Sequence, residues 1–264
     1  MECSSDIVLS VRGLKTYFFI GKKQEPVKAV DDVSLEVKKA SVTALVGESG
    51  SGKSVTSSSI FQLIDPPGKI LEGEILLHGK DLCKLSKKQR KSVYGKEISM
   101  IFQDPTSALN PVLKVKNQLL EAILLHRNMS KKDALEECRQ ALRKVSLKDT
   151  ETVLESYPFE LSGGMCQRVM IAMALLSQAD VLIADEPTTA LDLTIQASVL
   201  EEFKKIKEAG IAILFITHDL GIVAQMADYV YVMQQGRIVE HGDVFQIFDH
   251  PTHHYTKSLM EAIL

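Results

Sequence analysis

A glycine-rich segment, GESGSGKS, occupies residues 47–54 and matches the pattern GxxxxGK[ST] in full. Glycines let backbone N–H groups turn towards phosphate oxygens, and a following helix directs its positive end at them. In such a loop Lys53 reaches the β- and γ-phosphates of a nucleotide, and the Ser54 hydroxyl ligates Mg²⁺. We therefore expect an Mg-ATP site built from Gly47, Glu48, Ser49, Gly50, Ser51, Gly52, Lys53, Ser54 and Val55.

Two carboxylates end a hydrophobic run in VLIADEP, residues 181–187. The C-terminal edge of a parallel sheet is where ligands bind in α/β proteins. We expect Asp185 to hold Mg²⁺ and Glu186 to orient or deprotonate an attacking water. An acidic loop without chemistry is the alternative, and a phosphate loop in the same chain disfavours it.

Two further polar residues follow strand-like runs. Gln103 comes after EISMIF, and His218 comes after IAILFIT. Both could reach the γ-phosphate or the water, so both are candidate catalytic residues. A histidine with a purely structural role is the alternative for His218.

A second glycine turn, LSGGMCQR, lies at residues 161–168. Ser162, Gly163 and Gly164 would open a helix, and a helix start of this kind binds anions. Two phosphate-binding elements far apart in one chain suggest a pair of chains, each supplying one element to the other's nucleotide.

Strand-like and helical patterns place these motifs. IVLSVRGL (7–14) and VDDVSLEV (30–37) alternate as antiparallel strands do, whereas VTALVG (42–47) is a continuous apolar run typical of a buried parallel strand. Further strands are expected in EILLHG, EISMIFQ, VLIADEP and IAILFITH, and a hairpin over 229–242 turning at Gln235–Gly236.

Helical spacing occurs at residues 115–126, 130–145 and 194–208. In the second of these, Ser130 with Asp133 predicts a helix start. Its apolar stripe comprises Ala134, Leu135, Cys138, Ala141, Leu142 and Val145. Cys138 is therefore expected in the core, and the fold class is an α/β core interrupted by a helical lobe.

Composition excludes several classes. The net charge of −3 gives no support for nucleic acid, and the basic stretch from Lys84 to Lys96 is expected to be a solvated face. Cysteines at 3, 83, 138 and 166 form no CxxC pattern, which disfavours a zinc site or a disulfide framework. No apolar run is long enough to span a bilayer and no signal-peptide pattern is present, so we expect a soluble, intracellular chain.

Taken together, GESGSGKS, Gln103, LSGGM, LIADEP, Ala190-Leu191-Asp192 and His218 resemble the nucleotide-binding subunit of an ABC transporter, over nearly the whole chain. The resemblance implies a P-loop (RecA-like) core with an antiparallel β subdomain over 1–105 and 171–264, and an inserted helical signature subdomain over 106–170. Residues 1–264 would then be one ABC ATPase domain.

The same resemblance implies a role for each motif. Lys53 and Ser54 belong to the Walker A motif, and Gln103 is the Q-loop residue, which also approaches Mg²⁺ with Ser54 and Asp185. Ser162, Gly163 and Gly164 act on the partner's ATP, and Asp192 is the D-loop residue. Asp185 closes Walker B, Glu186 is the catalytic carboxylate and His218 is the switch histidine. Phe18 should stack on adenine, with Tyr17 as the alternative.

A narrower resemblance rests on IFQDPTSALNP, YPFELSGGM, ADEPTTALD and HPTHHYTKSL. These segments are similar to the oligopeptide/dipeptide/nickel subfamily of importers. This implies a heterodimer with a second ATPase, two membrane permeases that it drives from the cytoplasmic side, and an extracytoplasmic binding protein. Alternatives are a non-transport ABC ATPase, an exporter cassette and a regulatory subunit.

Three departures from the subfamily pattern stand out. Cys166 replaces the usual arginine after LSGGM, and Ala40-Ser41 replaces the usual Gly-Glu turn. The chain also ends soon after YTKSL, as nickel-type subunits do, which favours nickel slightly over peptides. The histidines at 250, 253 and 254 are nevertheless expected in a solvated tail, without a nickel site.

Overall fold

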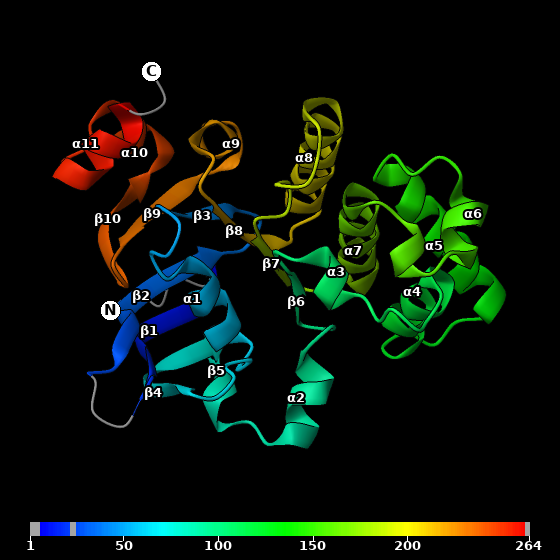
Figure 1. Cartoon of the computed structure of the whole chain (residues 1–264), viewed down its shortest axis with the longest axis horizontal. Coiled ribbons are helices and arrows are strands. Elements are labelled where there is room, and N and C mark those ends of the chain that lie inside the picture. Colours follow the sequence, from blue (N-terminus) through cyan, green and yellow to red (C-terminus); the bar gives the residue numbers. More distant parts are fainter. Residues whose placement is uncertain (1–5, 22–24, 262–264) are drawn as a thin grey trace. The chain divides into compact units, whose positions relative to one another are not determined.

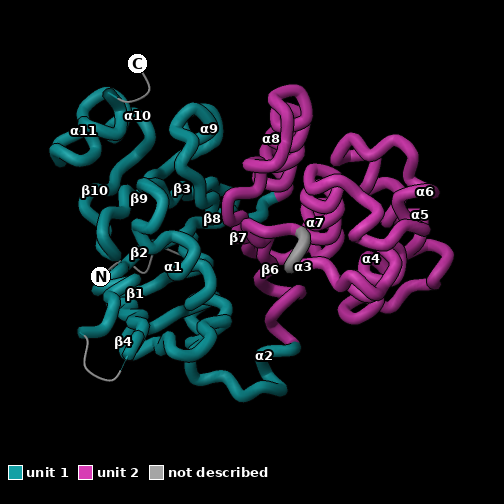
Figure 2. The backbone as a smooth tube through the Cα atoms, in the orientation of Figure 1, with its two compact units in different colours: residues 1–91, 210–264 teal, residues 92–209 magenta. Residues whose placement is uncertain are grey.

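The computed structural model describes residues 6–21 and 25–261, with the backbone alone for residues 106 and 107. The chain divides into two compact units (Figures 1 and 2). Unit 1 comprises residues 1–91 and 210–264, and unit 2 comprises residues 92–209. The segment predicted as the helical subdomain, 106–170, falls inside unit 2.

Unit 1 contains an antiparallel sheet with the strand order β2-β1-β4-β5. Its strands are β1 (Ile7–Phe18), β2 (Val27–Lys38), β4 (Gly68–Leu77) and β5 (Lys80–Asp81). In β2 the buried residues Val33, Leu35 and Val37 alternate with more exposed ones, whereas the first half of β1 is buried continuously from Val8 to Val11. The alternating segments predicted as strands are confirmed, and each is longer than its sequence pattern indicated.

The same unit contains parallel strands that carry the phosphate loop. Strand β3 (Val42–Val46) pairs in parallel with β8 (Ala212–Thr217) and with β9 (Tyr229–Gln234). Both β3 and β8 are buried along their whole length, which explains their continuous apolar sequences. Strand β10 (Arg237–Asp243) pairs antiparallel with β9, so the predicted hairpin and its turn at Gln235–Gly236 are confirmed.

The helices of unit 1 are short, and several begin at an aspartate. Asp219 caps α9 and Asp243 caps α10, each accepting a backbone N–H at the helix start. The helical elements are α1 (Lys53–Ile60), η1 (Leu82–Lys84), α2 (Lys87–Val93), which continues into unit 2, α9 (Leu220–Met226), α10 (Val244–Asp249) and α11 (His254–Glu261).

The C-terminal segment corrects one expectation. It was predicted as a solvated tail, but residues 254–261 form α11, and Tyr255 and Thr256 on it are buried. His250 and His254 are exposed, and His253 is partly buried. Among the described residues, no group of three histidine, cysteine or acidic side chains is placed to hold a metal ion.

Unit 2 combines two parallel strands with helices. Strand β6 (Ile98–Ile101) pairs in parallel with β7 (Val181–Asp185). The helical elements are α3 (Pro105–Ala108), α4 (Val115–Leu124), α5 (Lys131–Lys144), α6 (Thr150–Glu155), η2 (Pro158–Glu160), α7 (Gly163–Ser177) and α8 (Leu193–Glu208). Within the described residues, no helix has the length and apolar character needed to cross a membrane.

Helix α5 follows its sequence pattern closely. The Ser130 hydroxyl accepts the N–H of Asp133 at 3.1 Å, which confirms the predicted helix start. The predicted stripe is buried except for Leu135, which is partly buried. Burial raises the pKa of the Cys138 thiol to about 11, as expected for a core cysteine. Cys83, Cys138 and Cys166 are free thiols, and Cys3 lies outside the described residues.

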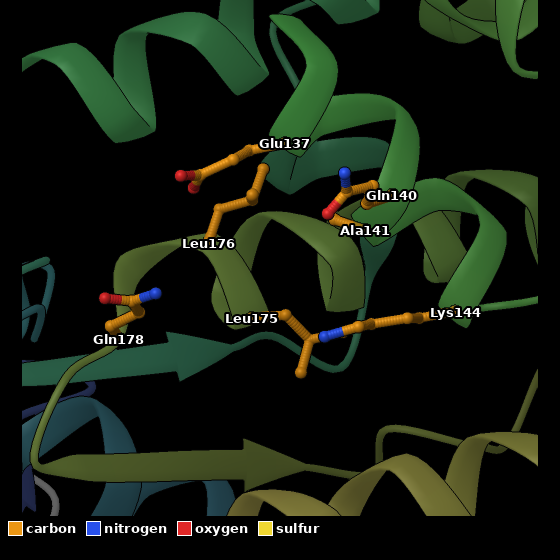
Figure 3. A pocket seen from close by; sticks show the side chains of 7 residues that line it. All are labelled: Glu137, Gln140, Ala141, Lys144, Leu175, Leu176 and Gln178. Carbon is orange, nitrogen blue, oxygen red and sulfur yellow. The ribbon is translucent and has the colours of Figure 1, made fainter. Parts of the chain in front are cut away.

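A surface pocket of about 270 Å³ lies between α5 and the C-terminal end of α7. Figure 3 shows that Glu137, Gln140, Ala141 and Lys144 line it from α5, that Leu175 and Leu176 line it from α7, and that Gln178 lines it from the residue after α7. The pocket holds none of the residues predicted for the nucleotide site.

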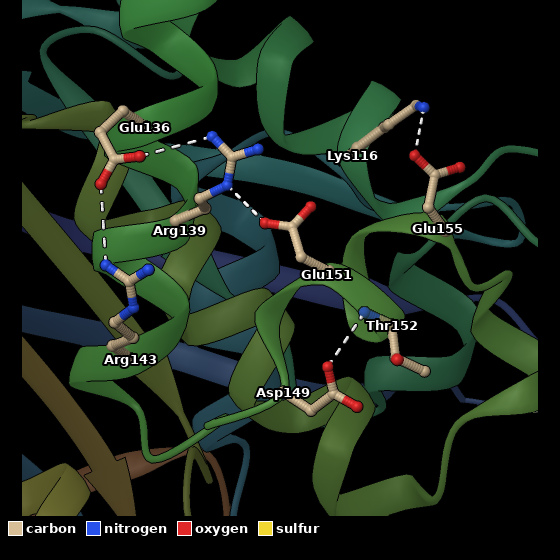
Figure 4. A network of polar contacts seen from close by, with 8 residues as sticks. All are labelled: Lys116, Glu136, Arg139, Arg143, Asp149, Glu151, Thr152 and Glu155. Carbon is tan, nitrogen blue, oxygen red and sulfur yellow. Dashed lines mark hydrogen bonds and ion pairs between the residues drawn. The ribbon is translucent and has the colours of Figure 1, made fainter.

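Ion pairs join the outer faces of α4, α5 and α6 (Figure 4). Arg139 bonds to both Glu136 and Glu151, and Lys116 bonds to Glu155. The hydrogen bond from Arg139 lowers the pKa of Glu151. The glutamates are solvent-exposed and Arg139 and Lys116 are partly buried, so the pairs add little to stability compared with the buried stripe of α5.

The turn between β2 and β3 has a strained residue. Ala40 has φ 52°, in the left-handed region that costs an L-residue roughly 1–2 kcal/mol. We expect Ala40→Gly to raise the free energy of unfolding by about 1 kcal/mol, measured by urea denaturation. Ala209→Gly is the matched control, because exposed Ala209 has φ −73° and glycine should lower stability there. Equal effects of the two substitutions would contradict the explanation.

A buried carboxylate fixes the start of α11. Glu240 accepts the Thr252 N–H at 2.7 Å and the Thr252 hydroxyl at 2.6 Å, and its other oxygen accepts the His253 N–H at 3.0 Å. Burial alone would raise the pKa of Glu240, but the hydrogen bonds outweigh it and lower that pKa to about 2.

This shift predicts a pH dependence of stability. Because the folded-state pKa of Glu240 lies below its ordinary value of 4.5, the carboxylate stabilises the fold above pH 4.5. That contribution, at most about 3 kcal/mol, is lost as the pH falls towards 2. The difference in unfolding free energy between wild type and Glu240→Gln should therefore narrow below pH 4.5. A difference that stays constant down to the lowest pH at which both proteins fold would contradict this assignment.

Candidate functional site

The phosphate loop requires glycine at two of its positions. Gly47 has φ 153° and Gly52 has φ 109°. A Cβ atom on Gly47 would lie 2.1 Å from the Met233 carbonyl oxygen, and one on Gly52 would lie 2.2 Å from that of Ala29. The loop is therefore pressed against neighbouring backbone on one side, which only glycine permits.

The inner side of the loop suits a phosphate chain. Lys53 is 6% exposed, and its ammonium donates to the carbonyl oxygens of Gly47 at 2.7 Å and Glu48 at 2.9 Å. The Ser51 hydroxyl is buried and has no hydrogen-bond partner among the described residues. Beside Gly50 a Cβ atom would meet nothing within 4 Å. A buried cation, an unused hydroxyl and open space fit a polyphosphate ligand.

The remaining loop residues complete the rim. Glu48 and Ser49 are exposed, and Ser54 and Val55 are partly buried in the first turn of α1. The N-terminal end of α1 thus directs its backbone N–H groups at the same place as Lys53.

His218 lies at the same edge of unit 1 as the phosphate loop. Strand β3 ends at Val46 and β8 ends at Thr217, and these two residues are register partners. Gly47 and His218 therefore follow neighbouring strand ends. His218 is exposed, and Asp219 after it is held by the Thr217 hydroxyl, which accepts its N–H at 3.0 Å.

Phe18 and Tyr17 end β1, in the antiparallel sheet of unit 1. The Phe18 ring is partly buried and lies close to Gly68, where a Cβ atom would come within 2.7 Å of it. The Tyr17 hydroxyl donates to the Asp31 carboxylate at 2.6 Å, and the Lys28 ammonium lies 5.7 Å from the centre of its ring.

Sequence reasoning missed the residues that support the loop. The Asp31 carboxylate accepts hydrogen bonds from both the Tyr17 hydroxyl and the Arg237 guanidinium. The bonds from Tyr17 and Arg237 lower the pKa of Asp31. The backbone of Gly236 links this cluster to the loop, since its N–H donates to the Ser51 carbonyl and its carbonyl accepts the Asp31 N–H, both at 2.8 Å. The hairpin turn at 235–236 was visible in the sequence, but its contact with the loop was not.

Unit 2 brings Gln103, Asp185 and Glu186 to one strand edge. In the β6–β7 pair, Ile101 and Ala184 are register partners, so Gln103 and Asp185 both follow the paired ends. Asp185 and Glu186 are 2% and 5% exposed, whereas Gln103 is exposed. Carboxylates and amides are groups that bind cations and water, and this strand edge presents two buried carboxylates and a solvent-facing amide.

Glu186 has an unusual backbone. Its φ of 49° lies in the left-handed region. Among the described non-glycine residues with positive φ, Glu186 is the buried one, and the others are exposed or partly buried. The Pro187 carbonyl accepts the Gln167 amide at 2.9 Å, and the Glu186 carbonyl accepts the Thr189 hydroxyl at 3.2 Å. The surroundings thus hold a strained residue in place, as is common at functional sites.

The second glycine turn opens α7 and faces solvent. The Ser162 hydroxyl accepts the Met165 N–H at 3.3 Å, and Ser162 and Gly163 are exposed. A Cβ atom on Gly164 would come within 3.0 Å of the Ala190 carbonyl, so this turn lies against the segment before Asp192. Asp192 is exposed and caps α8 by accepting the N–H groups of Thr194 and Ile195.

Cys166 occupies the inner side of α7. It is 1% exposed, and its sulfur donates to the Pro158 carbonyl at 3.3 Å. Arg168 supports the turn instead, donating to the Gly164 carbonyl at 3.2 Å and to the Ser146 carbonyl at 3.0 Å. The departure at Cys166 therefore leaves the exposed glycine turn itself unchanged.

A smaller and more apolar hollow, of about 170 Å³, lies between α4, α7 and β6 in unit 2. Phe102, which directly precedes Gln103, forms part of its wall. Its apolar lining comprises Met100, Phe102, Ala108, Leu109, Ala122, Met170, Met173 and Ala174.

Comparison with known proteins adds a family likeness. Residues 30–189 match the ABC transporter family. The chain is 48% identical over 258 residues to the oligopeptide transport ATP-binding protein AppD of Bacillus subtilis (strain 168), over 97% of this chain and 78% of that protein. It is 50% identical over 258 residues to the dipeptide transport ATP-binding protein DppD of the same strain, over 97% and 76% of the two chains.

Among solved structures, the chain is similar to the dimeric post-hydrolysis state of the ATP-binding cassette MJ0796 bound to ADP and Pi. The TM-score is 0.81 at 24% identity, over 89% of this chain and 98% of that one. At this identity the likeness concerns the fold alone. It confirms the predicted fold class, an α/β P-loop core with an antiparallel β subdomain and a helical subdomain.

Proposed function

The chain belongs to the ABC transporter family as an ATPase, and we propose that it hydrolyses Mg-ATP to energise the import of short peptides. The observation that carries this proposal is the similarity of the chain to two peptide-transport ATP-binding proteins. The sequences are 48% and 50% identical over 97% of this chain. The phosphate-ready geometry of the loop at residues 47–54 supports the ATPase part independently.

The residues of each unit take defined roles in this proposal. Lys53 exchanges its bonds to the loop carbonyls for bonds to the β- and γ-phosphates of ATP. Glu186 orients the attacking water and accepts its proton, while Gln103 and His218 contact the water or the γ-phosphate. Ser54, Gln103 and Asp185 would hold Mg²⁺, which supplies charge neutralisation for the phosphate oxygens when bound.

Adenine recognition is assigned to the end of β1. Phe18 offers a partly buried ring, whereas the Tyr17 hydroxyl is already bonded to Asp31. We therefore retain Phe18 as the stacking residue and Tyr17 as the alternative.

A second ATPase completes the proposed catalytic unit. Ser162, Gly163 and Gly164 would contact the ATP bound to that partner, and Asp192 would lie at the same interface. The solvent exposure of Ser162, Gly163 and Asp192 supports this assignment. Closure of the two subunits around ATP would then couple binding to movement, because ATP favours the closed state.

Two membrane permeases are the proposed site of attachment. The apolar hollow beside Phe102 and Leu109 would receive a permease segment, and Phe102 would pass its displacement to the adjacent Gln103. This places the subunit at the cytoplasmic face of the membrane through its partners. An extracytoplasmic binding protein would supply the cargo, and no nucleic acid is involved.

The cargo is tested on the assembled complex. We propose to reconstitute this chain with its permeases, second ATPase and binding protein in lipid vesicles, and to measure phosphate release with a dipeptide mixture or a Ni²⁺ chelate. Stimulation by dipeptides alone would support the proposal. Stimulation by the nickel chelate alone would replace peptide with nickel as the cargo. Phosphate release that neither ligand changes would favour a non-transport or regulatory ATPase.

A further inference from the structure

Tyr255 reaches the phosphate loop from the far end of the sequence. The backbone N–H of Glu48 donates to the Tyr255 hydroxyl at 2.9 Å. Tyr255 is 5% exposed and packs in a buried cluster that includes Val46 and Val232. Because the ring is enclosed by the strands that flank the loop, its hydroxyl has one defined position.

Glu48 is thereby fixed at both of its backbone polar groups. Its N–H is taken by Tyr255, and its carbonyl accepts the Lys53 ammonium at 2.9 Å and the Ser51 N–H at 3.1 Å. The Glu48 N–H shares its peptide group with the Gly47 carbonyl, which accepts the Lys53 ammonium at 2.7 Å, and the Glu48 carbonyl belongs to the next peptide group. The orientation of these two peptide groups therefore determines where Lys53 and Ser51 lie before a nucleotide binds.

The position of Tyr255 is itself fixed by the preceding residues. Glu240 holds Thr252 and His253 through three hydrogen bonds, and the Tyr255 N–H donates to the His253 Nδ1 at 3.3 Å. The start of α11 is thus tied to β10 immediately before the tyrosine. A flexible C-terminal segment could not hold the Tyr255 hydroxyl against the phosphate loop, whereas the anchored start of α11 can.

The same cluster contains residues of the helix that follows His218. Leu220 and Val223 of α9 lie in it together with Tyr255. Tyr255 of the C-terminal helix therefore shares a core with the strand that precedes the phosphate loop and with the helix that follows His218.

We propose that Tyr255 is a positioning residue, whose hydroxyl holds the Glu48 peptide so that the phosphate loop is formed before nucleotide arrives. This rests on the proposed nucleotide site at residues 47–54. A preformed loop does not lose conformational freedom when phosphate binds, so removal of the hydroxyl weakens nucleotide binding more than it slows turnover.

The first test uses Tyr255→Phe, which removes the hydroxyl and keeps the ring. Tyr231→Phe is the matched control, because Tyr231 is 8% exposed and its hydroxyl accepts the Glu36 N–H at 3.1 Å. In nucleotide-free protein, amide hydrogen exchange over residues 47–51 should be about 10-fold faster in Tyr255→Phe and unchanged in Tyr231→Phe. Equal exchange in both variants would overturn the proposal.

The second test measures ATP affinity by titration calorimetry. Loss of one buried hydrogen bond should raise the Kd of Tyr255→Phe about 3- to 10-fold, with kcat of the assembled complex unchanged within about 2-fold. A thermal stability loss shared by both tyrosine variants, with wild-type affinity in each, would mean a structural role only and overturn the proposal. If amide exchange over residues 47–51 is slow only when the Tyr255 hydroxyl is present, but the wild-type protein binds no ATP, the proposed nucleotide site is wrong and the positioning role of Tyr255 stands.

Discussion

Replacement of Glu186 by glutamine is expected to lower ATP hydrolysis at this chain's site by at least about 100-fold, with ATP affinity unchanged within about 2-fold. Glutamine has the shape of glutamate but cannot accept a proton from water. Glu186 is buried at the end of β7 and held at φ 49°, so the substitution should alter chemistry with little change in backbone.

The measurement is single-turnover phosphate release from the assembled transporter. The second ATPase should carry an alanine in place of its own phosphate-loop lysine, so that only the site with Glu186 reports. Glu202→Gln is the control, since Glu202 is 7% exposed and pairs with Lys205 on α8 at 2.6 Å. Unchanged phosphate release in Glu186→Gln would show that this carboxylate is not the catalytic base.

Two strand edges were predictable because of the composition of the strands that end there. VTALV and AILFIT are apolar except for one threonine each, and a near-continuous apolar sequence is typical of a strand buried on both faces. The residues directly after them, Gly47 and His218, must then emerge at the strand ends. The same argument placed Asp185 and Glu186 after VLIA and Gln103 after EISMIF. In the structure Val46 and Thr217 are register partners at the ends of β3 and β8, and Ile101 and Ala184 are register partners in β6 and β7.

Contacts across long sequence distances were not predictable in this way. Glu48 and Tyr255 are 207 residues apart, and neither residue type is diagnostic of a hydrogen bond to the other. The histidines of HPTHHYTKSL were expected in a solvated segment, because the subfamily that the sequence resembles already carries histidines in this motif. Glu240 lies 12 and 13 residues before Thr252 and His253, and it holds this segment in place by accepting their N–H groups.

Short helices were missed for a related reason. Helices α9 and α10 have 7 and 6 residues, too few to show a helical period. Their aspartate caps, Asp219 and Asp243, are local signals that a search for helix starts could have used. A departure from the family pattern was easier to interpret. Ala40 stands where the family usually has glycine, and its positive φ explains that preference.

Replacement of Lys53 by alanine should abolish measurable ATP binding, with a loss of affinity on the order of 100-fold or more. The ammonium is 6% exposed and bonds to the carbonyl oxygens of Gly47 and Glu48, so it braces the loop as well as providing the buried cation. Alanine removes both contributions, whereas loss of the Tyr255 hydroxyl removes only part of the bracing. We therefore expect the Kd of Lys53→Ala for ATP to be at least about 10-fold higher than that of Tyr255→Phe.

Calorimetric titration of ATP into the purified chain distinguishes this from general destabilisation. Lys204→Ala is the control, because Lys204 is paired on α8 with Glu201 at 2.7 Å and carries the same charge. Lys204→Ala should leave ATP affinity unchanged. The comparison therefore separates the effect of losing one positive charge anywhere on the protein from the effect of losing the Lys53 ammonium in the phosphate loop. If Lys53→Ala folds and binds ATP with wild-type affinity, the loop at residues 47–54 does not hold the phosphates. The buried Ser51 hydroxyl and the open space beside Gly50 would then need another ligand.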